Sequence, residues 1–183
     1  MTVIIRQAEH TDATAIADIY NQGIAERAAT FETQRRSVED IHARLADQLR
    51  FPTLVALHAG TVIGWGGMSS YRPRACYAGI GEFSIYIERR ARGLGVGRQL
   101  LETLVEAARE RGYWKLVSRI VPSNAGSLAL CRTCGFREVG VYEKHGCLDG
   151  HWLDVVIVER LIPQNLESCG AIATTDASIA HAE

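Results

Sequence analysis

The sequence has almost no excess of charge and no long apolar run. Lysine and arginine together number 20, aspartate and glutamate 21, and the formal net charge is −1. Because surfaces that bind nucleic acid are normally basic, this balance argues against a nucleic-acid partner. No stretch of about 18 apolar residues is present, so no membrane-spanning helix is predicted. The first residues also lack the basic and apolar segments of a signal peptide, and we expect a cytoplasmic protein with no membrane partner.

Cysteine is sparse and odd in number, which argues against a disulfide framework. The five cysteines are Cys76, Cys131, Cys134, Cys147 and Cys169. The pair Cys131-x-x-Cys134 could bind a metal with His145 and Cys147, or form a redox pair, but no second C-x-x-C accompanies it. The other interpretation is a pair of buried thiols on a short helix. We therefore predict no metal site.

Hydrophobic periodicity predicts one mixed α/β domain over residues 1–162. Strands are expected at 3–6, 53–58, 62–68, 77–87, 115–121, 137–142 and 151–161. Helices are expected from Thr11 or Asp12 through Ile24, from Ser37 through Leu49 to Pro52, from residue 96 to Gly112, and from 122–124 to Gly135. The order is β-α-α-β-β-β-α-β-α-β-β. Residues 163–183 lose this periodicity and are expected to form a poorly ordered tail.

The most informative stretch is a glycine-rich loop between an expected strand and an expected helix. It consists of Arg92, Gly93, Leu94, Gly95, Val96, Gly97 and Arg98. Glycine lets backbone N–H groups approach a ligand closely, and a helix N-terminus favours an anion. The loop is neither a Walker A motif nor a G-x-G-x-x-G dinucleotide fingerprint. It predicts a pyrophosphate site, although a glycine-rich turn without a ligand is the simpler alternative.

Two motifs resemble those of the GNAT acetyltransferase family over residues 3–161. Arg92-x-x-Gly95-x-Gly97 resembles the family's Q/R-x-x-G-x-G/A pyrophosphate loop, and residues 124–136 resemble its N-x-x-A/S-x-x-L-Y-x-x-x-G-F signature. The resemblance implies a mostly antiparallel mixed sheet flanked by helices, with acetyl-CoA as co-substrate. It also implies that the cofactor is bound by the 92–98 loop, by Asn124 and Ser127, and by the main chain of Ile85, Tyr86 and Ile87. Asn124 could equally serve as a helix N-cap.

One position departs from the family signature. Cys131 stands where many members carry a tyrosine that can protonate the leaving thiolate. An unperturbed cysteine has a pKa near 8.5 and could donate a proton. The general acid therefore stays open between Cys131, Tyr86, Tyr142 and solvent, and Cys131 could simply be a small hydrophobic contact.

Residues 81–87 resemble the T-x-E-x-S-V-Y-V segment of the phosphinothricin acetyltransferase subfamily. This implies that Glu82 is the general base, because only a deprotonated amine can attack a thioester. An exposed strand glutamate is the alternative. The segments 29–32, 71–77, 142–146 and 150–155, together with Asn21, resemble further subfamily motifs in the same order.

The subfamily resemblance implies a small toxic amino acid as substrate, of the phosphinothricin, methionine sulfoximine or arsinothricin type, and resistance as the outcome. Two guanidinium groups, Arg72 and Arg74, suit its anionic groups, although a solvated basic loop is the alternative. The resemblance adds Thr30 and Phe31 to the substrate site, and Lys144 and His145 to that of a neighbouring subunit in a homodimer. Two other functions stay open: acetylation of a protein N-terminus or polyamine, and non-catalytic acyl-CoA sensing.

Overall fold

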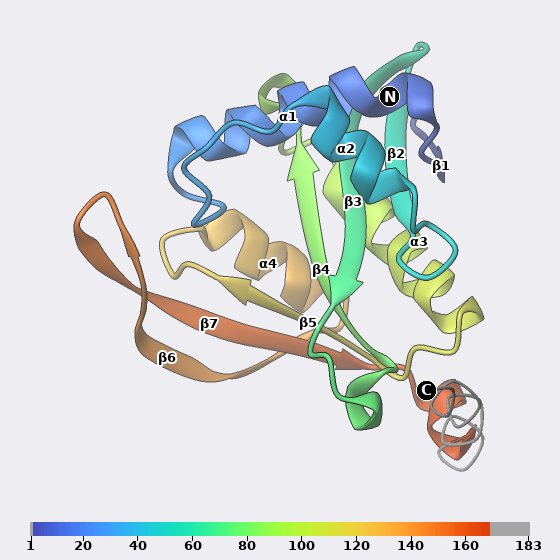
Figure 1. Cartoon of the computed structure of the whole chain (residues 1–183), viewed down its shortest axis with the longest axis vertical. Coiled ribbons are helices and arrows are strands. Elements are labelled where there is room, and N and C mark those ends of the chain that lie inside the picture. The colour runs from blue at the N-terminus through green and yellow to red at the C-terminus, as the bar shows by residue number, and fades with distance from the viewer. Residues whose placement is uncertain (1, 169–183) are drawn as a thin grey trace, which may run out of the picture.

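The protein is built on one twisted seven-stranded sheet, seen in a computed structural model that describes residues 2–168 (Figure 1). The spatial order of the strands is β1-β2-β3-β4-β5-β7-β6, and only the β4–β5 pair is parallel. The strands are β1 Ile4–Gln7, β2 Thr53–His58, β3 Thr61–Ser70, β4 Ile80–Ile87, β5 Lys115–Ile120, β6 Arg137–Leu148 and β7 His151–Leu161.

Helices cover both faces of this sheet. Helices α1, Ala13–Glu26, and α2, Val38–Leu45, lie on one face, and α3, Val96–Glu110, and α4, Ala125–Thr133, lie on the other (Figure 1). Strand β2 shows why two cores form: Leu54 and Ala56 pack with α3, whereas Val55 between them packs with α1 and α2. Alternate strand residues point to opposite faces, so one apolar strand supplies both cores. The predicted element order and fold class are confirmed.

Short 3-10 turns and revised boundaries account for most differences from the sequence-based expectation. The turns are η1 His10–Asp12, η2 Ala75–Tyr77, η3 Arg89–Ala91 and η4 Pro163–Ser168. Turn η2 delays β4 until Ile80, and β6 continues past 142 to Leu148 through an irregularity between Tyr142 and Gly146. Among the described residues, no helix is long and apolar enough to cross a membrane.

The expectation that the second helix continues through Leu49 is wrong. Its predicted capping box is present, since Ser37 Oγ accepts the Asp40 N–H and Asp40 Oδ2 accepts the Ser37 N–H. The helix nevertheless ends at Leu45, and Leu49 is 91% exposed. The chain turns there, and the next apolar side chain, Phe51, packs against the core instead.

The start of the expected tail is structured. Residues Pro163–Ser168 form η4, and Asn165 Nδ2 donates to the main-chain oxygens of Arg109 at 2.7 Å and Tyr113 at 2.8 Å. Residues 169–183, which include Cys169, lie outside the described part of the chain.

The feature that positions the functional site is a fork between β4 and β5. The two strands pair only from Ile80↔Lys115 to Glu82↔Val117, although β4 continues to Ile87. Ser118 Oγ donates to Phe83 O at 3.0 Å and closes the base of the fork. Beyond this point the β5-facing edge of β4 has no strand partner among the described residues, which leaves main-chain polar groups free for a ligand.

Candidate active site

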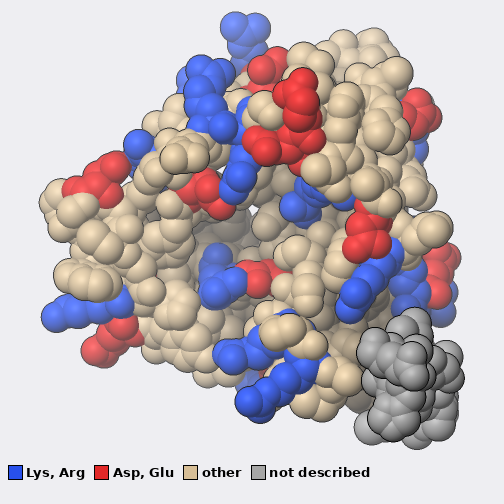
Figure 2. Space-filling model, in the orientation of Figure 1, with Lys and Arg blue, Asp and Glu red and all other residues tan. Residues whose placement is uncertain are grey.

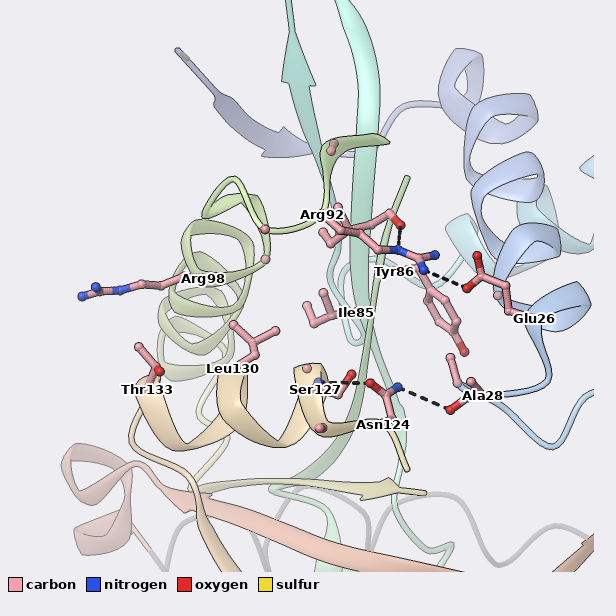
Figure 3. Close-up of a pocket in the computed structure, with 18 of the residues that line it drawn as sticks. Glu26, Ala28, Ile85, Tyr86, Arg92, Arg98, Asn124, Ser127, Leu130 and Thr133 are labelled. Atoms are coloured by element: carbon pink, nitrogen blue, oxygen red, sulfur yellow. Dashed lines mark hydrogen bonds and ion pairs between the residues drawn. The ribbon is translucent and has the colours of Figure 1, made fainter. Parts of the chain in front are cut away.

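A cavity of about 530 Å³ occupies the open fork (Figure 3). It is bounded by the C-terminal half of β4, the 92–98 loop, the end of α1 and the start of α4. Ten of the twelve residues predicted to bind the cofactor line it: Ile85, Tyr86, Ile87, Arg92, Gly93, Gly95, Gly97, Arg98, Asn124 and Ser127.

The 92–98 loop presents the N-terminus of α3 to this cavity. Gly93 and Gly95 have φ angles of +75° and +80°, which L-residues rarely adopt, so these two positions require glycine. Gly95 is the N-cap and offers no side chain, so no cap group occupies the first-turn N–H groups of α3. Free N–H groups at the positive end of a 15-residue helix form an anion site.

Two loop residues have side chains that do not line the cavity. The Leu94 side chain is 55% exposed, and Val96 lies in the core at 1% exposure. The buried Val96 side chain therefore cannot contact a ligand, and Leu94 lies outside the cavity lining.

The two loop arginines are held differently. Arg92 turns toward α1, where its Nη1 lies 2.8 Å from Glu26 Oε2, and its Nε donates to Ile87 O at 3.0 Å. Arg98 lines the cavity near its backbone, but its guanidinium points away (Figure 3), and its Nε donates to Glu102 at 2.9 Å. Arg92 is therefore the loop guanidinium that lies at the cavity.

Glu26 is a cavity residue that no sequence motif indicated. Besides Arg92 it contacts Arg89, at 2.9 Å. Burial disfavours its ionised form, but hydrogen bonds from Arg92 and Arg89 outweigh burial, so the pKa of Glu26 lies below its usual value. A negative charge thus sits beside the anion site.

The free edge of β4 directs polar main-chain groups into the fork. Phe83 O accepts from Ser118 on the β5 side, and Ile87 O accepts from Arg92 on the same side. Since strand residues two apart point their main-chain groups the same way, Ile85 presents its N–H and C=O to the fork as well. This edge can extend an antiparallel or parallel hydrogen-bond ladder to an amide-containing ligand.

Asn124 both caps a helix and spans the far wall of the cavity. Its Oδ1 accepts the Ser127 N–H at 3.1 Å, the N-cap bond expected for asparagine. Its Nδ2 donates to Ala28 O at 3.4 Å, which ties α4 to the loop after α1 (Figure 3).

A smaller cavity, of about 70 Å³, continues the first toward Arg119 and shares several lining residues with it. The guanidinium of Arg119 binds both carboxylate oxygens of Glu82, with Nε–Oε1 2.9 Å and Nη2–Oε2 2.6 Å. The Glu82 side chain is 20% exposed and that of Arg119 49%. Arg119 was not anticipated, because nothing in the sequence near residue 119 marks it as a partner of a residue 37 positions away.

Of the expected proton donors, Cys131 and Tyr86 are both buried. Burial raises the pKa of the Cys131 thiol to about 12, and the thiol lines the smaller cavity. The Tyr86 ring stacks on Trp65 at 5.0 Å, and burial raises the pKa of its phenol well above the usual value. Tyr142, on β6, is 51% exposed.

Arg72 and Arg74 lie in the loop between β3 and β4, both exposed. The Arg72 guanidinium lies over the Tyr71 ring, 5.2 Å from its centroid, and Arg74 has an extended backbone just before η2. Among the described residues, neither forms an ion pair with a carboxylate, and neither lines the two cavities above. The loop emerges where Ser70 pairs with Gly81, one residue from Glu82.

Of the other residues predicted for the substrate, Phe31 in the α1–α2 loop contacts β6, the strand that carries Lys144 and His145, and Thr30 faces β4. The Phe31 ring covers Gly146, where an added Cβ would lie 2.5 Å from Phe31 Cε1, and Thr30 lies beside the Tyr86 hydroxyl. The Lys144 N–H donates to Asp154 at 2.7 Å, and the His145 ring lies 5.1 Å from that of Tyr142.

A second contact ties the same two segments together. Arg27 Nε lies 3.0 Å from Asp149 Oδ2, in the turn between β6 and β7. None of Thr30, Phe31, Lys144 and His145 lines the two cavities, so the contact zone forms a wall outside them.

The alternative of a metal site at Cys131 and Cys134 finds no support in the described residues. Cys131 and Cys134 are buried, whereas Cys147 is exposed on β6. No group of three or more His, Cys, Asp or Glu side chains in the described range could hold a metal ion.

Comparison with known proteins places this geometry in one family. The family model described as "Acetyltransferase (GNAT) family" matches residues 16–136. A phosphinothricin N-acetyltransferase of Alcaligenes faecalis is 37% identical over 85% of this chain and 81% of its own. An L-methionine sulfoximine/L-methionine sulfone acetyltransferase of Pseudomonas paraeruginosa is 33% identical over 87% of this chain and 94% of its own.

Solved structures agree. A phosphinothricin acetyltransferase from Sinorhizobium meliloti, in complex with acetyl-CoA, superposes with a TM-score of 0.83, 32% identity and coverage of 88% and 89% of the two chains. A ribosomal-protein-alanine N-acetyltransferase from Brucella melitensis superposes with a TM-score of 0.84, 35% identity and coverage of 87% and 99%. The chain therefore belongs to the GNAT acetyltransferase family and is an N-acetyltransferase with acetyl-CoA as its acetyl donor.

Proposed function

We propose that the enzyme acetylates the α-amino group of a small glutamate-like amino acid of the phosphinothricin, methionine sulfoximine or arsinothricin type, and thereby confers resistance to it. The observation that carries the proposal is the position of Glu82, at the inner end of the fork and flanked by basic side chains. The names of the relatives support this substrate class.

Acetyl-CoA is proposed to lie along the fork. Its pyrophosphate would accept hydrogen bonds from the first turn of α3 and from Arg92, and its pantetheine amides would pair with the free edge of β4 at residues 85–87. Asn124 and Ser127 would line the opposite side. This path leads from the 92–98 loop toward Arg119, which lines the smaller cavity and binds Glu82.

Glu82 is proposed to bind the substrate ammonium and to take its proton, directly or through water. The free amine then attacks the thioester carbonyl carbon, so that a C–N bond forms and the C–S bond breaks. The electron pair leaves with the CoA sulfur, and the thiolate takes a proton from solvent. Cys131 is a poor donor for that step, since its pKa of about 12 holds the proton tightly.

Arg72 and Arg74 are proposed to bind the distal end group of the substrate. Their loop leaves the sheet next to Glu82, and both side chains lie free of carboxylate partners within the described residues. A phosphinate, sulfoximine or arsinate group at the end of a short side chain would extend toward this loop while the amine stays at Glu82. Guanidinium groups can donate two hydrogen bonds at once to the oxygen atoms of such end groups.

A substrate panel tests the proposal. Thiol release from acetyl-CoA is measured with phosphinothricin, methionine sulfoximine, methionine sulfone, arsinothricin, glutamate, a diamine and an alanine-initiated peptide. We expect the highest kcat/KM for amino acids with a polar tetrahedral or pyramidal end group. A higher kcat/KM for the diamine or the peptide would contradict the proposal, and no thiol release with any of them would favour an acyl-CoA sensor.

We further propose that the enzyme is a homodimer that pairs through the β6–β7 hairpin. The two strands of this hairpin expose five large apolar residues: Val139, Val141, Tyr142, Trp152 and Leu161. Exposed apolar residues gathered on one element favour an interaction surface. Light scattering should give twice the chain mass for the parent and one chain mass for Trp152→Glu, and a monomeric parent would contradict the proposal.

A further inference from the structure

Arg119 is the charged group closest to the proposed base, and the function described so far gives it no role. It extends from β5 and occupies both oxygens of Glu82 with Nε and Nη2. Glu82 cannot receive an ammonium with full freedom while the guanidinium holds both oxygens. Something must therefore separate this pair when substrate binds.

We propose that Arg119 binds the α-carboxylate of the substrate, and that the zwitterionic amino acid separates the Arg119–Glu82 pair by inserting between its members. This inference rests on the proposed function and restricts it to free α-amino acids. The substrate ammonium replaces the guanidinium at Glu82, and the substrate carboxylate replaces Glu82 at Arg119.

The geometry of an α-amino acid requires a carboxylate receptor next to the base. Its amine nitrogen and carboxyl carbon are bonded to the same carbon and lie only about 2.5 Å apart. With the amine at Glu82, the carboxylate must fall within reach of a group that already touches Glu82, and Arg119 is that group. Arg72 and Arg74 lie on the loop beyond Gly81 and are better placed for the distal end group.

The surroundings allow the exchange. Glu82 pairs across the sheet with Val117, and Arg119 follows two residues later, so both side chains emerge on one sheet face. Arg119 lines the smaller cavity that continues from the cofactor cavity, and its side chain is 49% exposed. Figure 2 shows this face hollowed near its centre, with basic and acidic side chains next to each other in the hollow.

The exchange also selects among amine substrates. An α-amino acid brings one charge of each sign and satisfies both members of the pair. A polyamine brings only positive charge and would leave Arg119 facing a cation, and a peptide N-terminus carries an uncharged amide where the carboxylate should be. Arg119 therefore disfavours both alternative substrate classes.

The test combines a change in the enzyme with a change in the substrate. The parent, Arg119→Gln, Arg119→Lys and a control are assayed with methionine sulfoximine and with its α-carboxamide. The control is Arg109→Gln, which breaks another two-oxygen arginine–glutamate pair, with Glu106, on the exposed surface of α3.

We expect the parent to prefer the acid over the amide by about 10- to 100-fold in kcat/KM, the effect of losing charge-assisted hydrogen bonds. For Arg119→Gln, kcat/KM with the acid should fall by the same 10- to 100-fold, and kcat/KM with the amide should stay unchanged. The ratio of the two should therefore fall to near one. Arg119→Lys should recover part of the preference for the acid. KM for acetyl-CoA should stay unchanged, and Arg109→Gln should behave as the parent.

A parent that does not distinguish acid from amide, or an Arg119→Gln variant that keeps the preference, overturns the inference while leaving the proposed function standing. Faster acetylation of the acid by Arg119→Gln also overturns it, because Arg119 would then only block Glu82. If the parent acetylates no amino acid at all, the proposed function fails, and this inference fails with it.

Discussion

The two ends of the fork between β4 and β5 are built from different groups. The outer end, which we assign to acetyl-CoA, offers mainly main-chain N–H and C=O groups from the 92–98 loop, the start of α3 and the free edge of β4. The inner end offers charged side chains from separate segments, with Glu82 on β4 and Arg119 on β5, and the loop that carries Arg72 and Arg74 leaves the sheet next to Glu82.

This difference suggests how the protein divides its tasks. In our proposal, main-chain groups bind the parts of acetyl-CoA that every acetyl transfer shares, and such contacts tolerate changes in the side chains of the residues that make them. In the same proposal, charged side chains select the substrate, and a single substitution would change which charges the substrate meets. Substitutions at the outer end should therefore act through backbone shape, and those at the inner end through charge.

Glu82→Gln should produce the largest effect, because it removes the proposed base and keeps the side-chain shape. Loss of a general base typically lowers the rate by about 10²–10⁴. The measurement is kcat from pH 6 to 9 at saturating acetyl-CoA. Glu106→Gln is the control, since Glu106 pairs with an arginine in the same two-oxygen manner but lies on exposed α3. Parent-like turnover by Glu82→Gln across this range would contradict the role of Glu82.

Gly95→Val tests whether the backbone conformation of the 92–98 loop is needed to bind acetyl-CoA, because it changes no charged group. Gly95 has a φ of +80°, and the N–H groups it precedes start α3. A β-branched residue strains this conformation, so the loop should shift and the affinity for acetyl-CoA should fall by about a hundredfold. Isothermal titration measures this.

The matched control for that change is Gly60→Val. Gly60 has a φ of +78° and equally open surroundings, but it lies in the turn between β2 and β3. It should lose similar folding stability and keep its acetyl-CoA affinity. Equal acetyl-CoA affinity in folded Gly95→Val and Gly60→Val proteins would rule out the assignment of the loop.

The outer end could be located from sequence because its parts are contiguous. The glycines at 93, 95 and 97, followed by the amphipathic start of α3, identify a loop and a helix N-terminus within a few residues. Asn124 could be identified as an N-cap for the same reason, since Ser127 is only three residues away. Local hydrogen bonding sets these conformations, and local sequence reports it.

The inner end could be located only in part, because it depends on pairings between distant segments. Glu82 was identified through a motif on its own strand, but Arg119 was not, since its partner lies on another element. Glu26, at the outer end, was missed for the same reason, because it pairs with Arg92 on a distant segment. The length of α2 shows the same limit: the spacing of Ile41, Leu45 and Leu49 fits a longer helix, and the chain turns because Phe51 packs into the core.

Arg74→Ala tests whether the inner end discriminates substrates by charge. It should raise KM for phosphinothricin-like substrates by about 10- to 100-fold, through loss of a charge-assisted hydrogen bond to the end group. KM for acetyl-CoA should not change, and Arg74→Lys should rescue only in part. Steady-state kinetics with each substrate varied in turn checks both. A rise in KM for acetyl-CoA, or no change in either KM, would reduce Arg74 to a surface charge.

Glu26→Gln tests the exception to the comparison, a carboxylate at the outer end. Glu26 holds Arg92 at 2.8 Å and adds a negative charge beside the proposed pyrophosphate site. Its removal should free Arg92 for the phosphates, and acetyl-CoA should bind more tightly by up to about fivefold, since such pairs contribute about 0.2–1 kcal/mol. Isothermal titration at pH 7 measures this, with Arg92→Gln expected to show the opposite sign.

The pH dependence of folding stability tests whether Glu26 is held as an ion pair. The pKa of Glu26 lies below its usual value of 4.5, so the pairs with Arg92 and Arg89 stabilise the fold fully above that pH. As the pH falls through the lower folded-state pKa, the carboxyl protonates and this contribution is lost. The difference in unfolding free energy between the parent and Glu26→Gln should therefore be constant from pH 6 to 8 and shrink below 4.5. Urea denaturation at each pH measures it, and a difference that grows on acidification would show that Glu26 is not held as an ion pair.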